Sequence, residues 1–358
     1  MEYPAVVLEA LGQLPRLETV TVHNPGPDEV AVRMAASGIC HTDIGYMQYA
    51  RACPVLLGHE GAGVVEQVGA NVTHVQPGDH VVISWQVKCN RCRWCLSGRQ
   101  DLCENVQGTA APRFFWRDEP LNIMLNAGTF CPVAIVPAMG AIPIRRDMPL
   151  EKAALLGCAV ATGVGAVLYT ARVQPGENVV VIGAGGVGLN IIQGARLANA
   201  GFIIAIDLND ENLGRAASVF GATHTLNSRE TDPAAAVREI TGGRGVEHVF
   251  EVVGLPVLMQ QGINMLARGG TLTLVGAAER EAQFSFHPRR FMSMQQTIKG
   301  CIYGSIRPAV DLPMFADWYM DGRLRLDDLH TATINLEDVP AVFAGGSGGI
   351  RTIIRFNG

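Results

Sequence analysis

The sequence has no excess of basic residues and begins without a recognisable secretory signal. Lysine and arginine together number 28 against 33 aspartate and glutamate residues, so the formal net charge is -5. Proteins that hold a phosphate backbone present a basic surface, so we expect no nucleic-acid partner. The opening stretch MEYPAVVLEA lacks the basic head and long apolar core of an export signal. We therefore expect a cytoplasmic protein.

Charged residues are also few, at 17% of the 358 residues, and one segment has none. Residues 153–171 carry no charge over a length close to that of a bilayer span. This segment contains Gly157, Gly163 and Gly165 and leads directly into a nucleotide-binding pattern, so we interpret it as a buried helix and expect no membrane association. With 48% hydrophobic residues, the chain can bury a large core and should divide into about two domains.

Nine cysteines are present, and four of them lie close together in the sequence. Their spacing is C-x-x-C-x-x-C, then seven residues and a fourth cysteine: Cys89, Cys92, Cys95 and Cys103. This spacing is typical of a closed tetrahedral zinc site, which predicts a structural zinc lobe over residues 86–104. Disulfides, a redox pair or an iron-sulfur cluster are the alternatives, and disulfides do not suit such a tight loop. We interpret Cys53, Cys131 and Cys301 as packing residues.

A second candidate metal site lies in residues 38–63, GICHTDIGYMQYARACPVLLGHEGAG. Cys40, His59 and Glu60 fall together there, and catalytic zinc usually has three protein ligands and one open position. Cys158, in LLGCAVATG, is the candidate third ligand. Asp43 is placed to hold the outer nitrogen of a ligating histidine. The alternative is that these residues simply pack, because a single cysteine or histidine is more often buried than ligating.

The pattern of short apolar runs divides the chain into two kinds of structure. Residues 1–85 alternate β-rich runs with glycine, proline and aspartate, which predicts an antiparallel, barrel-like domain. Residues 104–128 are irregular, so we expect loops over a cleft whose aromatic side chains form a small core of their own. Strand patterns resume at 133–144, and a helix is predicted over 150–170.

From residue 177 strands and helices alternate, which predicts a doubly wound parallel sheet of about six strands. Gly183, Gly185 and Gly188 form G-x-G-x-x-G between the first strand and its helix, where a pyrophosphate can approach backbone amides. Asp207 ends the second strand nineteen residues after Gly188, where a carboxylate can bind ribose hydroxyls and repel a 2'-phosphate. The next residues, Leu208 and Asn209, supply no basic partner for a 2'-phosphate, although Arg215 lies further along the helix, so NAD is preferred over NADP. Glycines that only allow close packing are the alternative.

These motifs occur together in an order that resembles the zinc-dependent alcohol dehydrogenases of the medium-chain dehydrogenase/reductase superfamily. The resemblance covers nearly the whole chain and rests on GICHTD, GHEGAG, the four-cysteine lobe, LLGCAVATG, GAGGVG with Asp207, and GGIRTIIRF. It implies an α/β protein in which a Rossmann domain (160–302) binds NAD. A mainly β, GroES-like catalytic domain (1–159 and 303–358) would carry the zinc lobe.

The resemblance also implies roles for individual residues. Cys40, His59 and Cys158 would hold a catalytic zinc, with Glu60 as an occasional ligand or neighbour, and two zinc ions are expected per chain. Thr42 would relay the substrate proton, and Trp85 would line the substrate pocket. The positions that match cofactor-binding residues are His41, Thr162, Gly183, Gly185, Gly186, Val187, Gly188, Asp207, Val275 and Arg351.

One position departs from the family, because many relatives carry a relay histidine five residues after the first zinc cysteine and this chain has Gly45 there. The relay would then end in water, a ribose hydroxyl or His41. The leading expectation is an NAD-dependent primary or aromatic alcohol dehydrogenase, working as a homodimer or homotetramer. The alternatives are a mycothiol- or glutathione-type formaldehyde dehydrogenase, and a non-catalytic structural protein that binds zinc and NAD.

Overall fold

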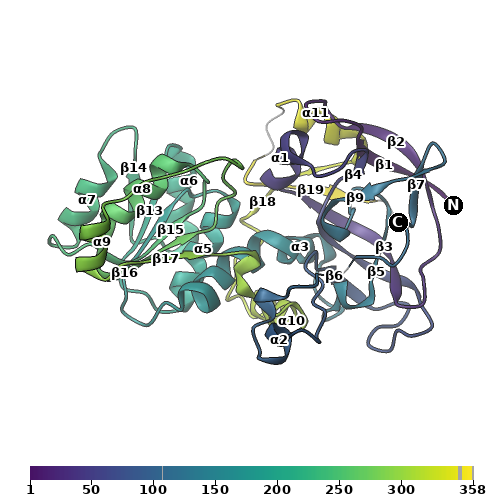
Figure 1. Ribbon diagram of the computed structural model, residues 1–358, viewed down its shortest axis with the longest axis horizontal. Coiled ribbons are helices and arrows are strands. Elements are labelled where there is room, and N and C mark those ends of the chain that lie inside the picture. Colours follow the sequence, from purple (N-terminus) through teal and green to yellow (C-terminus); the bar gives the residue numbers. More distant parts are fainter. Residues whose placement is uncertain (107, 346–348, 357–358) are drawn as a thin grey trace. The chain divides into compact units, whose positions relative to one another are not determined.

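The structure is a computed structural model that describes residues 1–106, 108–345 and 349–356. The chain forms two compact units (Figure 1). Unit 1 comprises residues 1–158 and 307–358, and unit 2 comprises residues 159–306. Unit 1 is therefore built from two segments of the chain, and unit 2 from the segment between them.

Unit 1 contains two sheets. The first has the order β8 (Glu119–Pro120), β7 (Phe114–Trp116), β2 (Arg16–Val22), β1 (Glu2–Leu8), β4 (Val55–Leu56), β9 (Asn122–Ile123). The second has the order β11 (Ala141–Pro143), β6 (His80–Ile83), β5 (Glu60–Val68), β3 (Glu29–Ile39), β19 (Arg351–Arg355), β18 (His330–Ile334), and β10 (Val133–Pro137) also pairs with β3. Most pairs in both sheets are antiparallel, whereas β18 with β19 and β4 with β9 are parallel. The helices of unit 1 are α1 (His41–Tyr49), α2 (Arg93–Leu96), α3 (Leu150–Leu155), α10 (Pro308–Met320) and α11 (Val339–Phe343).

The prediction that residues 104–128 form only loops was wrong. Strand β7 pairs with β2, with Thr21 opposite Phe115, and β8 pairs with β7. Phe114 and Trp116 are buried in the same core as Val7, Val20 and Leu56. Because alternate residues of a strand face the same side, this three-residue strand buries two aromatic rings in the core of the unit, so they do not form a separate core of a loop.

Unit 2 is a six-stranded parallel sheet flanked by helices (Figure 1). The strand order is β14 (His224–Asn227), β13 (Ile203–Asp207), β12 (Val179–Ile182), β15 (Val246–Glu251), β16 (Leu266–Leu274), β17 (Thr297–Gly300). In chain order this is 3-2-1-4-5-6, the arrangement of a dinucleotide-binding Rossmann fold. The helices are α4 (Ala161–Gly165), α5 (Gly186–Leu197), α6 (Asp210–Arg215), α7 (Pro233–Ile240), α8 (Pro256–Met265) and α9 (Pro288–Met294). The predicted fold class, a Rossmann domain with a mainly β partner domain, is confirmed.

The uncharged segment is the greater part of one long helix, Leu150–Ala171, with wide π-helical turns at Leu156–Val160 and Ala166–Ala171. By length and composition alone it could cross a membrane, but most of its apolar stretch is buried within the protein. Helix α3 packs on β3 and β5, and α4 packs on α5. These contacts are those of a core helix.

Candidate active site

Four potential metal ligands meet in unit 1 at the ends of regular elements. Cys40 lies between β3 and α1, His59 directly precedes β5, Glu60 begins β5, and Cys158 lies in the first π-helical turn. One ligand atom from each falls within 4.8 Å of the others, and all four residues are buried. Wide helical turns of this kind occur frequently at functional sites. The structure thus brings together residues that are up to 118 positions apart in the sequence.

Asp43 holds two of these groups in place. One of its oxygens, Oδ2, accepts a hydrogen bond from the Cys40 backbone amide at 2.7 Å, and Oδ1 lies 2.8 Å from His59 Nδ1. Because Nδ1 is engaged by a carboxylate, Nε2 of His59 is left to bind a metal. Burial raises the pKa of Asp43, whereas the nearby His59 opposes this rise.

The two thiols at this site titrate as a pair. The hydrogen bond from Cys158 holds the pKa of Cys40 well below its usual range, and the same contact raises the pKa of Cys158. A cysteine binds a metal as the thiolate, and the lowered pKa of Cys40 favours that form. A divalent cation would favour ionisation of Cys158 as well. Two sulfurs and one imidazole nitrogen at this separation suit the ligand set that zinc takes in catalytic sites.

Glu60 and Arg351 form a buried ion pair next to this cluster. Arg351 Nη1 lies 3.3 Å from Glu60 Oε1 and donates to the Ile39 carbonyl at 3.3 Å. Burial raises the pKa of Glu60 to about 7, and neither of its carboxylate oxygens has a hydrogen-bond partner within the described residues. Such oxygens, a few ångströms from two thiols and an imidazole, also fit a bound cation. The assignment of Arg351 to the cofactor phosphates remains a prediction.

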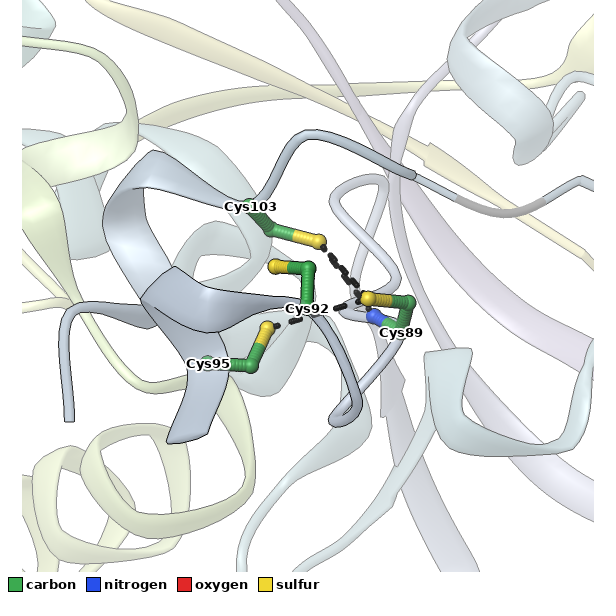
Figure 2. Close-up of side chains that lie close together, drawn as sticks. All are labelled: Cys89, Cys92, Cys95 and Cys103. Atoms are coloured by element: carbon green, nitrogen blue, oxygen red, sulfur yellow. Dashed lines mark hydrogen bonds between the residues drawn. The ribbon is translucent and has the colours of Figure 1, made fainter. Parts of the chain in front are cut away.

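The four cysteines of the zinc lobe also converge (Figure 2). The Cys89 sulfur lies 3.5 Å from that of Cys103 and 4.0 Å from that of Cys95, and no disulfide joins them. A tetrahedral site with zinc–sulfur bonds of about 2.3 Å has sulfurs about 3.8 Å apart, so the cluster matches a closed structural zinc site. The backbone amide of Arg91 contributes most to lowering the pKa of Cys89 to about 6, which favours the thiolate.

In unit 2 the glycines of the glycine-rich turn have different surroundings. A Cβ added to Gly188 would collide with the Gly183 carbonyl oxygen, whereas one added to Gly185 would meet no atom within 4 Å. Gly188 therefore allows close packing, and Gly185 leaves the backbone open to a ligand. Gly185 caps α5 and Gly186 begins it, so the first backbone amides of that helix, which lack partners within the helix, follow directly.

Asp207 connects the end of β13 to this turn. Its Oδ2 accepts a hydrogen bond from the Ala184 amide at 2.7 Å, and its Oδ1 accepts one from the Asn209 amide at 2.9 Å. Arg215 pairs with Glu211 at 3.1 Å, so it is already neutralised on its own helix. This environment favours ribose hydroxyls over a 2'-phosphate.

Comparison with known proteins finds two family matches, one in each half of the chain. Residues 26–149 match the alcohol dehydrogenase GroES-like domain, and residues 186–318 match the zinc-binding dehydrogenase family. The S-(hydroxymethyl)glutathione dehydrogenase of Paracoccus denitrificans is 36% identical, covering 98% of this chain and 99% of that protein. The chain belongs to the zinc-dependent alcohol dehydrogenases. It is accordingly an NAD-dependent oxidoreductase with sites for two zinc ions.

Two solved structures extend the comparison of this alcohol dehydrogenase. An alcohol dehydrogenase zinc-binding domain protein from Burkholderia ambifaria is 35% identical with a TM-score of 0.93, covering all of both chains. Benzyl alcohol dehydrogenase from Acinetobacter calcoaceticus is 30% identical with a TM-score of 0.92, again over all of both chains.

The remaining predicted residues of the alcohol dehydrogenase lie in both units. His41 and Thr42 open α1, where His41 is exposed and Thr42 half-buried. The Trp85 ring stands edge-on to His59, with centroids 6.3 Å apart. In unit 2, Val187 lies in the first turn of α5, Thr162 lies in α4, and Val275 follows β16.

Two features of this site were not predicted from the sequence. One is the ion pair of Glu60 with Arg351, which joins residues too distant for any local pattern. The other is Tyr49, whose ring covers Gly45 one helical turn away. The spacing of four residues between Gly45 and Tyr49 could have indicated it if a helix had been predicted over residues 41–49.

Proposed function

We propose that the protein interconverts a primary or aromatic alcohol and its aldehyde, with hydride transfer to and from NAD. The observation that carries the proposal is the buried set of Cys40, His59 and Cys158. Asp43 bonds to the Cys40 amide and to the His59 ring. Zinc bound by these residues would act as a Lewis acid that makes the alcohol hydroxyl easier to deprotonate, and bound NAD would accept the hydride.

The residues of the chain have separate tasks in this proposal. Asp43 fixes the orientation and tautomer of His59, so the imidazole presents Nε2 without reorganisation. Thr42, two residues after Cys40, supplies the hydroxyl that receives the proton leaving the alcohol. Trp85, edge-on to His59, is an apolar wall for the carbon skeleton of the substrate.

A second candidate is the oxidation of the hydroxymethyl adduct of a thiol with formaldehyde. It is supported by the relative from Paracoccus denitrificans, an S-(hydroxymethyl)glutathione dehydrogenase, which is similar to this chain over nearly its full length. An adduct of glutathione or mycothiol carries the same primary hydroxyl as an alcohol, so the same groups would act on it. The two candidate substrates differ in the group attached to the carbon that bears this hydroxyl.

The test is a substrate panel followed at the absorbance of the reduced nicotinamide. Ethanol, benzyl alcohol and longer primary alcohols form one arm, and formaldehyde with glutathione or mycothiol forms the other. Faster turnover of free alcohols supports the first candidate, and turnover that needs both formaldehyde and a thiol supports the second. If the zinc-loaded protein reduces NAD in neither arm, both fail and a structural role replaces them.

We also propose a cytoplasmic location. None of the nine cysteines forms a disulfide, although five of them are half-buried and the others are buried. Free thiols of this number persist in a reducing compartment.

A further inference from the structure

The space beside Gly45 in α1 is filled by Tyr49. A Cβ built on Gly45 would lie 2.7 Å from the Tyr49 ring carbon Cζ and would also collide with Cε1 and the hydroxyl oxygen. Residues four apart share one face of a helix, and helical side chains lean toward the amino end. The ring of Tyr49 therefore lies over Gly45 and points back toward Thr42.

The hydroxyl of Tyr49 reaches the start of the helix. It donates a hydrogen bond to the Thr42 carbonyl oxygen at 3.2 Å, long for a bond between oxygens. A bond of this length is readily exchanged for one to water. The phenol oxygen also keeps free lone pairs, so it can accept one proton while it gives up another.

Tyr49 is open to solvent although its helix also carries buried residues. Tyr49 is 47% exposed, whereas Cys40, which caps the helix, and Asp43 within it are buried. The edge-on contact with Tyr46, with centroids 5.6 Å apart, fixes the ring. A proton that leaves the buried cluster must reach solvent, and the partly exposed phenol of Tyr49 offers a hydroxyl on that route.

We propose that the Tyr49 hydroxyl takes over the proton-relay position that is empty at Gly45, passing the proton from Thr42 to solvent. The inference rests on the proposed function. The Thr42 hydroxyl gains the alcohol proton and releases its own to the phenol oxygen, directly or through one water, while the phenol proton moves to bulk water. The Thr42 and Tyr49 hydroxyls are neutral before and after the transfer, the alcohol is left as an alkoxide, bulk water carries the released proton, and no electrons are gained or lost.

Burial, with the nearby Cys40 next in importance, raises the pKa of Tyr49 to about 12. The phenol therefore stays protonated at neutral pH and acts as a relay, without ionising to become a base. It acts through Thr42 and touches no substrate, so it is a positioning and relay residue.

The direct test measures proton release without turnover. NAD and trifluoroethanol, an alcohol that is not oxidised, are mixed with the zinc-loaded enzyme, and a pH indicator follows the released proton by stopped flow. We expect Tyr49→Phe, which keeps the ring, to slow release at least about tenfold at pH 7. The loss should shrink as pH or buffer concentration rises, because hydroxide and buffer then take the proton directly.

Two variants serve as matched controls. Tyr46→Phe removes the neighbouring phenol of the same helix and should leave the rate unchanged. Gly45→His with Tyr49→Ala places an imidazole in the cleared space and should restore release relative to Tyr49→Ala alone. Equal release rates and buffer dependence in Tyr49→Phe and wild type, or an equal loss in Tyr46→Phe, would overturn the relay. A wild type that releases the proton but oxidises no substrate would instead refute the proposed function.

Discussion

Asp43 shows how much of the candidate site depends on one side chain. It is fully buried, and each of its oxygens engages a different group, the Cys40 amide and the His59 ring. A buried carboxylate without these bonds would be costly, so its position and that of His59 determine each other. The spacing of Cys40 and Asp43 arises because Asp43 is the third residue of the helix that Cys40 caps.

Thr42 is the residue at which the proposed chemistry can be tested most directly. Thr42→Val keeps the shape of the side chain and removes the hydroxyl, so we expect turnover to fall about 100-fold or more. Thr42→Ser keeps the hydroxyl and should lose little. Steady-state kinetics on the best substrate, with zinc analysis and NAD titration, checks both variants.

The neighbouring histidine provides the contrast for this prediction. His41→Gln should weaken NAD binding more than it changes the pH dependence of turnover, because we assign His41 to the cofactor phosphates. Wild-type turnover in Thr42→Val, or loss of its zinc, would remove Thr42 from the relay.

Among the elements, the four-cysteine lobe contains little regular structure. Its only helices are α2 and one 3-10 turn at Gln100–Leu102. Such a segment gains its order from the metal, because structural zinc contributes folding free energy directly.

Cys92→Ser should therefore remove one of two zinc ions per chain and lower the melting temperature by about 10 °C, corresponding to about 3 kcal/mol. Elemental analysis and thermal unfolding provide the measurement. Cys301→Ser, a cysteine outside both clusters whose sulfur accepts a hydrogen bond from Thr170, should keep both ions. One zinc in the wild type would contradict this assignment.

The turn between β12 and α5, with Asp207 beside it, should determine which cofactor the protein prefers. Asp207 should give NAD an advantage over NADP of about 100-fold in kcat/KM, about 3 kcal/mol, because its charge would face the extra phosphate. Asp207→Ser should reduce that ratio, mainly through weaker NAD binding. Glu230→Gln, an exposed carboxylate elsewhere in the unit, is the control. Equal use of both cofactors by the wild type would show that Asp207 does not select.

Elements with local patterns were predictable, and those defined by distant partners were not. The strand β12 and its glycine turn could be identified because a buried parallel strand is continuously apolar and the turn needs glycine. The short strands around Phe114 could not, since three residues become a strand only by pairing with β2, about 90 positions earlier. For the same reason the sequence offered no pattern for the contact of Arg351 with Ile39, 312 positions away.

For the whole molecule, buried thiols and phenols predict a loss of stability in alkali. Burial raises the pKa of Cys131 to about 12 and, with Asp327 adding to the effect, that of Tyr319 to about 12. In the unfolded chain these groups lose protons near pH 9 and pH 10. The folded state then binds more protons than the unfolded state, so stability should fall as pH rises from about 9 to about 12.

Melting temperatures measured between pH 8 and 10.5 test this prediction. Cys131→Ala should give a shallower decline than the wild type, even though its melting temperature at pH 8 is lower. Parallel curves would show that Cys131 does not contribute to the alkaline limit.

For the oligomeric state of the whole molecule, we propose a dimer or a tetramer built of dimers. Strand β17 ends the parallel sheet and pairs on one side only among the described residues. Exposed edges are usually covered, and Ile302 just beyond it is 55% exposed. Light scattering should show at least twice the chain mass, and Ile302→Glu should lower it. Leu96→Glu, on the zinc lobe, should retain at least a dimer, and a monomeric wild type would exclude the proposal.

The split of unit 1 into two segments has a consequence for biosynthesis. A ribosome makes all of unit 2 before it makes β18 and β19, so the Rossmann sheet can be complete while the second sheet of unit 1 still lacks its last strands. Until β19 is made, β3 has a free edge beside Cys40 and Glu60 has no Arg351 to neutralise it. The cofactor-binding sheet can therefore form while the cluster around Cys40 and Glu60 still lacks β19 and Arg351.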